Sequence, residues 1–169
     1  MATKNLSAYS ATELPDATDM FIGIVVSEWN AHITNALRDG AIEVLQAAGI
    51  PKEQILLDYV PGSFELPMGA QMMLETHPLD AVIVLGSVIR GETPHFEFVC
   101  DACAQGVMRV GLDHQTPVIF GVLTDNNEEQ ALARAGGEKG NKGIEAAVTA
   151  LKMVAFNDRL VSRMAESMG

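Results

Sequence analysis

The chain has 169 residues, of which 48% are hydrophobic and 20% charged, so a folded globular protein is expected rather than a disordered one. Its apolar runs are far shorter than the roughly 20 residues that a membrane-spanning helix needs, and no membrane partner is expected. The 11 basic and 22 acidic residues give a net charge of −11, which repels phosphodiester backbones and argues against a nucleic-acid partner. An anionic small ligand would need a local positive site.

The first 20 residues differ in character from the rest. They are polar, contain Pro15 and show no periodicity, so a flexible N-terminal arm (1–20) is expected before a single domain over 21–169. This segment lacks the apolar core of a secretory signal, and the two cysteines, Cys100 and Cys103, are too few for a disulfide framework. Both features favour a cytoplasmic location.

Strands and helices are predicted to alternate after the arm. Short apolar runs indicate strands, and apolar residues at helical spacing indicate helices. In chain order the elements are strand 21–27, helix 32–48, strand 55–60, helix 64–77, strand 80–89, helix 94–111, strand 117–123, helix 127–135 and helix 144–162. Asp125 and Glu128 are expected to cap the short fourth helix, and the glycine-rich segment 136–143 is expected to link it to the last one.

This alternation predicts the fold and the position of a site. Strands that are apolar on both faces form parallel sheets covered by helices, so we expect a three-layer α/β/α sandwich with a flavodoxin-like four-stranded parallel sheet. Ligands of open α/β sheets bind outside the carboxyl ends of the strands. The unusual residues of this chain gather in the segments that would lie there, at 27–32, 60–65, 86–95 and 123–127, or in the glycine-rich segment.

The segment 86–95 is a candidate anion site. A strand ends before Gly91 and a helix opens at Glu92 and Thr93, and free backbone N–H groups at a helix N-terminus bind phosphate or carboxylate. The alternative is an ordinary turn in which Thr93 is the N-cap. His95, one turn into this helix, is suited to proton transfer near neutral pH; the alternative is a surface histidine.

Three of the few aromatic residues, Trp29, Phe64 and Phe120, are expected near the same edge, where they would form a platform for a planar heterocycle. Core packing is the competing interpretation, above all for Phe120. Glu65 is a candidate hydrogen-bond acceptor or, alternatively, a solvated carboxylate at a helix start.

Arg134 and Lys142 flank the glycine-rich segment, where they could hold a second or distal anion. The alternative is an exposed linker. The Cys100 and Cys103 pair falls in the middle of a helix without a second cysteine or histidine pair, so packing is expected and no metal.

Four motifs occur in order between about residues 21 and 154, namely Pro61–Glu65, Gly86–Phe96, Pro117–Gly121 and Arg134–Gly143. Together they resemble the 6,7-dimethyl-8-ribityllumazine synthase family of riboflavin biosynthesis. The resemblance implies condensation of 5-amino-6-(D-ribitylamino)uracil with 3,4-dihydroxy-2-butanone 4-phosphate, with no metal and no cofactor. An imine forms, phosphate is eliminated, and ring closure with loss of water gives the lumazine.

The resemblance also implies roles for residues. Trp29 takes the stacking position, where phenylalanine is more frequent, and His95 is the acid/base. The pyrimidine and ribityl chain would contact Ser63, Phe64, Glu65, Ser87, Val88, Ile89 and Phe120. The phosphate would contact Gly91, Glu92, Thr93 and Arg134, with Lys142 as a supporting cation. Glu92 occupies a variable position, where only the main chain is needed.

The family resemblance further implies a homopentamer with sites between neighbouring subunits, so that Phe120 and Arg134 face the neighbour's Trp29 and Glu65 loops. Some members close pentamers into an icosahedral 60-mer shell, and riboflavin synthase is a candidate partner. Two other classes compete: a binding or shell protein without turnover, which would not need His95, and a flavodoxin-like nucleotide or signalling domain. The latter is disfavoured because 27–32 lacks a phosphate-cradling run of small polar residues.

Overall fold

A computed structural model describes residues 7–10, 12 and 14–168. Its centre is a sheet of four parallel strands in the order β2-β1-β3-β4. The strands are β1 (Ile22–Ser27), β2 (Ile55–Val60), β3 (Ala81–Ile89) and β4 (Val118–Asp125). The two central strands, β1 and β3, are the most apolar, because helices cover them on both faces.

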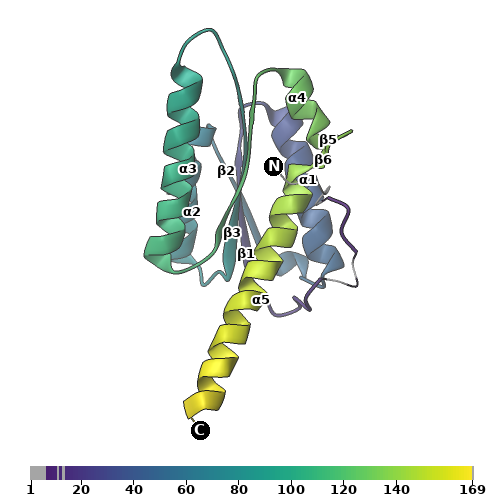
Figure 1. Ribbon diagram of the computed structural model, residues 1–169, viewed down its shortest axis with the longest axis vertical. Helices are drawn as coiled ribbons and strands as arrows, with labels where there is room; N and C mark the ends of the chain where they lie inside the picture. The colour runs from purple at the N-terminus through teal and green to yellow at the C-terminus, as the bar shows by residue number, and fades with distance from the viewer. Residues whose placement is uncertain (1–6, 11, 13, 169) are drawn as a thin grey trace.

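The helices lie in two layers, one on each face of the sheet, as Figure 1 shows. Helices α2 (Leu66–Thr76) and α3 (His95–His114) cover one face, and α1 (Ala31–Ala47) and α5 (Lys142–Met168) cover the other. The short α4 (Glu128–Ala133) follows β4, and two 3-10 turns, η2 (Lys52–Gln54) and η3 (Ser63–Glu65), flank β2. The predicted three-layer α/β/α sandwich is confirmed.

The glycine-rich segment is not the plain linker that the sequence suggested. It forms a small antiparallel hairpin of β5 (Ala135–Gly137) and β6 (Gly140–Asn141). The buried Asn141 then starts α5, because its Oδ1 accepts hydrogen bonds from the backbone N–H groups of Gly143 at 2.8 Å and Ile144 at 3.3 Å. The helix therefore begins at Lys142 rather than at residue 144. It continues past residue 162 because no glycine or proline occurs between Ile144 and Met168.

Two helix starts also differ from the prediction. Pro94, not Thr93, is the N-cap of α3, and it caps the helix without a side-chain hydrogen bond. His95 is thus the first residue of the helix, not one turn into it. For α4 the cap is Asn127, whose side chain accepts from the Gln130 N–H, while Asp125 is buried at the end of β4.

The N-terminal segment contributes to the core before β1 begins. Ala17 and Met20 are buried, and the Ala17 N–H donates to the Ala48 carbonyl at 3.2 Å. Residues 1–6, 11 and 13 lie outside the described part of the chain, so the flexibility of the arm stays a prediction. Among the described helices, none is long and apolar enough to cross a bilayer.

Candidate active site

A cavity of about 450 Å³ opens at the carboxyl ends of β1 and β3, against the start of α3. It is lined by Trp29, Asn30, Ser63, Phe64, Glu65, Ser87, Val88, Ile89, His95 and Val99. These residues come from four segments that are far apart in sequence. The cavity thus brings together most of the residues assigned to the pyrimidine, together with the candidate acid/base His95.

The floor of the cavity is an unpaired backbone edge of β3. Pairing between β1 and β3 ends at Val26 and Leu85, whereas pairing between β3 and β4 continues to Ile89 and Asp125. On the β1 side, the backbone groups of Ser87 and Ile89 therefore have no strand partner, although the Ser87 carbonyl accepts from a side chain of the β1–α1 turn. Their remaining N–H and C=O groups can pair with a ligand whose edge carries amide-like donors and acceptors.

One wall of the cavity is aromatic. Trp29 is 68% exposed and Phe64 58% exposed, which is unusual for side chains of this size. Gly62 permits the close packing of this wall, because a Cβ at that position would lie 3.0 Å from Glu65 Oε2 and 3.1 Å from the Trp29 ring. The Trp29 backbone N–H also donates to the Pro61 carbonyl at 3.2 Å. The indole and the Glu65 carboxylate therefore both border Gly62, and most of the indole is open to a planar ligand.

Two lining residues were not predicted. Asn30 has a left-handed backbone (φ 60°), and its Nδ2 donates to the Ser87 carbonyl at 3.0 Å, which ties the β1–α1 turn to the overhanging end of β3. An asparagine before a helix indicates a helix cap, so this position could have been noted from the sequence. The bond from Asn30 to Ser87 depends on the strand register and could not be predicted. Val99 could have been found, because it lies one helical turn after His95 and so on the same face of α3.

His95 lies at the mouth of the cavity as the first residue of α3. It is exposed, and within the described chain neither ring nitrogen has a hydrogen-bond partner. Both nitrogens are therefore free to exchange protons with a ligand in the cavity.

Buried polar atoms without a partner gather at the same edge of the sheet. Among the described residues they are Ser27 Oγ at the end of β1, Ser87 Oγ in β3 and Asp125 Oδ2 at the end of β4. Such atoms are rare in folded proteins because each costs the desolvation of a polar group. Their concentration here indicates that the side chains at this edge of the sheet do not serve packing and stability alone.

The residues assigned to the phosphate are not among those that line the cavity. Gly91, Glu92 and Thr93 form the exposed loop between β3 and α3. Arg134 borders a separate hollow of about 690 Å³ beside α4, where its Nη1 donates to the Gln130 carbonyl at 2.9 Å.

Lys142 and Phe120 also lie apart from the cavity in the single chain. The Lys142 ammonium pairs with the Glu145 carboxylate at 2.9 Å. Phe120, in the middle of β4, packs into the core under α2 and α3.

The cysteine pair packs as the sequence indicated. Cys103 is fully buried and Cys100 half-buried, both as free thiols, and burial raises the pKa of the Cys103 thiol to about 12. No group of three or more histidine, cysteine, aspartate or glutamate side chains that could hold a metal ion occurs in the described part of the chain.

The fold and the cavity define a flavodoxin-like α/β protein with a ligand pocket at the carboxyl ends of its strands. A family model described as 6,7-dimethyl-8-ribityllumazine synthase matches residues 19–158. Proteins with that name from Cytophaga hutchinsonii and Parabacteroides distasonis are 56% identical over 154 residues and 53% identical over 156 residues. These alignments cover 91% and 92% of this chain and 96% and 98% of those relatives. The chain belongs to the 6,7-dimethyl-8-ribityllumazine synthase family.

Proposed function

We propose that the cavity at the ends of β1 and β3 is where this chain catalyses its family's reaction. The chain is a transferase of riboflavin biosynthesis, and it condenses 5-amino-6-(D-ribitylamino)uracil with 3,4-dihydroxy-2-butanone 4-phosphate. The products are 6,7-dimethyl-8-ribityllumazine, phosphate and water.

One observation supports the proposal above the others: a single cavity holds an exposed indole, a strand edge without a strand partner and a histidine whose ring has no hydrogen-bond partner among the described residues. A pyrimidinedione has a flat face and an amide-like edge. The face stacks on Trp29, and the edge pairs with the backbone of Ser87, Val88 and Ile89. The ribityl hydroxyls lie towards Ser63, Phe64 and Glu65.

The chemistry needs proton transfers rather than a redox or metal step. The 5-amino group adds to the ketone of the second substrate, and loss of water gives the imine. A proton then leaves C3 of the former butanone as the C–O bond to phosphate breaks, and the resulting enol takes up a proton to become a ketone. The ribitylamino nitrogen adds to this new ketone, and loss of a second water closes the ring. His95 accepts and returns protons in these steps, because its ring opens onto the cavity and has no competing partner in the described chain.

The phosphate is assigned to the loop of Gly91, Glu92 and Thr93, whose backbone N–H groups are exposed beside His95. Arg134 supplies the ionic partner and Lys142 a supporting positive charge. Since the cavity of the single chain contains neither cation, we infer that a neighbouring subunit brings Arg134 and Phe120 to it, as in the homopentamer expected for the family.

Two features of the single chain support an oligomer. On α3, Phe98, Met108 and Leu112 are 72%, 64% and 69% exposed, a large apolar area for a free surface. Strand β4 is an edge of the sheet and leaves a row of backbone groups available for pairing. A 60-mer shell and contact with riboflavin synthase rest on family membership alone. The two free thiols support a cytoplasmic location.

The test uses the chain's single tryptophan, which is Trp29. Titration with the pyrimidine substrate should quench its fluorescence with a midpoint that agrees with the KM for that substrate, with N-acetyltryptophanamide as the control for light absorption. Trp29→Ala should raise this KM about fivefold to tenfold, whereas Trp29→Phe, which keeps a stacking ring, should change it by about threefold or less. Unquenched fluorescence at saturating substrate would place the pyrimidine elsewhere.

A further inference from the structure

Arg90 is the last residue before the loop of Gly91, Glu92 and Thr93, and its side chain makes contacts in two directions. Its Nε donates to Asn126 Oδ1 at 3.0 Å, in the segment that follows β4. Its Nη1 donates to the Glu97 carboxylate in the first turn of α3. Its backbone N–H also donates to the Asp125 carbonyl at 2.9 Å. One residue thus joins the ends of β3 and β4 to the start of α3.

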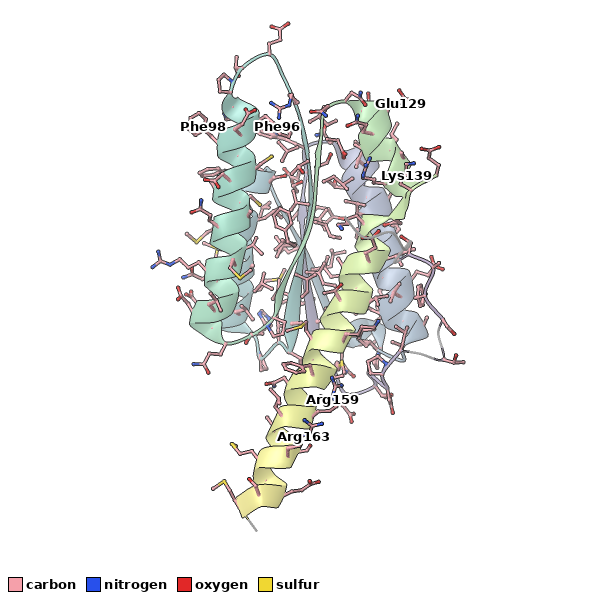
Figure 2. The ribbon with its side chains drawn as sticks, in the orientation of Figure 1. Phe96, Phe98, Glu129, Lys139, Arg159 and Arg163 are labelled. Atoms are coloured by element: carbon pink, nitrogen blue, oxygen red, sulfur yellow. The ribbon has the colours of Figure 1, made fainter. Side chains whose placement is uncertain are left out.

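The guanidinium also stacks on an aromatic ring. Its central carbon lies 4.2 Å from the centre of the Phe96 ring, a favourable cation–π distance. Figure 2 shows Phe96 and Phe98 projecting from opposite sides of α3, with Phe96 on the side towards the sheet. The hydrogen bond from Arg90 lowers the pKa of the Glu97 carboxyl, so that this group stays ionised as a partner. Arg90 contacts Phe96 and Glu97, the two residues that follow His95 in α3, so it also helps to fix the first turn that carries His95.

The loop itself has few other constraints. Gly91, Glu92 and Thr93 are exposed, and a Cβ on Gly91 would meet nothing within 4 Å. Pro94 caps α3 without a side-chain bond. In the described part of the chain, Gly91, Glu92 and Thr93 make no hydrogen bonds of their own. The loop is therefore held through the residues at its two ends, and Arg90 makes three hydrogen bonds at the first of these ends.

We propose that Arg90 is a positioning residue that holds the loop of Gly91, Glu92 and Thr93 in the conformation that binds the substrate phosphate. This inference rests on the proposed function, which assigns the phosphate to that loop. Arg90 acts on the position of the loop rather than on the phosphate itself, since its Nε is engaged by Asn126, its Nη1 by Glu97 and its planar face by Phe96. Lysine cannot replace it, because a single ammonium on a flexible stem does not reach two acceptors and a ring in fixed geometry.

The experiment compares Arg90→Lys with Arg109→Lys in the full-length protein. Arg109 is the control, because it lies on α3, the helix that follows the loop, is 83% exposed and pairs only with Asp113 at 3.3 Å among the described residues. Two measurements are made on each variant: amide hydrogen exchange at residues 90 and 97, whose N–H groups donate to the carbonyls of Asp125 and Pro94, and the KM values of both substrates. Asn126→Ala is measured as well in case Arg90→Lys folds poorly. It removes one of the two hydrogen-bond acceptors of the Arg90 side chain without changing a charge.

For Arg90→Lys we expect exchange of the hydrogen-bonded amides at residues 90 and 97, one on each side of the loop, to accelerate about tenfold. The KM for the butanone phosphate should rise about tenfold while the KM for the pyrimidine stays within about twofold, since small displacements of anion donors are costly. Asn126→Ala should raise the exchange rate and the KM for the butanone phosphate by smaller factors. Arg109→Lys should change neither the exchange rate nor this KM. A general loss of packing would instead raise exchange along all of α3 and impair both substrates.

Two results would overturn the proposal, and they differ in what they imply. Unchanged exchange in Arg90→Lys and Asn126→Ala would show that Arg90 does not hold the loop. Faster exchange with an unchanged KM for the butanone phosphate would show that Arg90 holds a loop that does not bind phosphate. In that second case the phosphate assignment under the proposed function fails as well.

Discussion

The carboxylate of Asp125 lies 3.5 Å from the guanidinium of Arg134, measured from Oδ1 to Nη1, and the two groups differ sharply in exposure. The Asp125 side chain is 7% exposed and that of Arg134 40% exposed. The other carboxylate oxygen, Oδ2, is buried without a partner. Burial raises the pKa of the Asp125 carboxyl, and the positive charge of Arg134 opposes part of that rise. The end of β4 thus carries a buried carboxylate whose negative charge Arg134 stabilises only in part.

We expect Asp125→Asn to stabilise the folded chain at pH 7. A carboxyl whose pKa is raised in the folded state binds its proton more tightly there, so its ionised form costs stability above that pKa, and the cost disappears as pH falls through it. Replacing the charge by an amide should add about 1 kcal/mol at pH 7, or about 2–4 °C in Tm for a chain of this size. Thermal unfolding followed from pH 7 down to the acid limit of the fold measures this.

The control is Asp113→Asn, on the exposed helix surface, where a change of no more than about 0.5 kcal/mol is expected. The advantage of Asp125→Asn over the wild type should shrink towards zero at acid pH. An advantage that is the same at every pH, or a loss of stability at pH 7, would mean that the bond to Arg134 outweighs the burial of the charge.

The fold was predictable because burial patterns in the sequence are strong and local. The nine residues of β3 are almost continuously apolar, and only a strand covered on both faces needs that. The gathering of Trp29, Glu65 and His95 followed from topology, since the carboxyl ends of parallel strands share one edge.

The details that were missed depend on partners distant in sequence. Asn141 starts α5 and also donates from Nδ2 to the Ala36 carbonyl at 2.9 Å, a contact across 105 positions of the chain. Asn30 bonds to Ser87 and Arg90 to Asn126 in the same way. A side chain with several acceptors within reach can be assigned to one only when the strand register is known, and the sequence does not supply it.

His95→Ala should lower turnover by about 10²-fold or less and leave the fold intact, because general acid–base catalysis contributes about 10²–10⁴-fold and imine condensation has a sizeable uncatalysed rate. The KM values of both substrates should change little. His114→Ala, a histidine at the opposite end of the same helix, is the control and should retain full turnover. Steady-state formation of the lumazine, followed by its absorbance, measures both variants; equal rates would remove His95 from the mechanism.

Gly86→Ala should destabilise the chain, since a Cβ there would lie 2.6 Å from Ser63 Oγ and 2.9 Å from Leu66 Cδ1, behind the wall of the cavity. Overpacking of this kind costs about 1–3 kcal/mol, so Tm should fall by several degrees. Gly91→Ala is the matched control, because a Cβ there meets open space and Tm should not change. In Gly91→Ala the KM for the butanone phosphate should nevertheless rise, if the phosphate approaches that backbone closely. Similar Tm values for the two variants would contradict the packing around Gly86.

Arg134 and the cavity that contains His95 are separate in the single chain. Arg134 borders the hollow beside α4, whereas His95 lies at the cavity mouth. If a site combines the two from neighbouring subunits, Arg134→Ala should mainly raise the KM for the butanone phosphate, and His95→Ala should mainly lower kcat. Unfolding the two variants together and refolding the mixture should then regenerate some sites with both side chains intact, and activity should exceed that of either variant refolded alone. Mixtures no more active than the mean of the two parents would place Arg134 and His95 of each site on one chain.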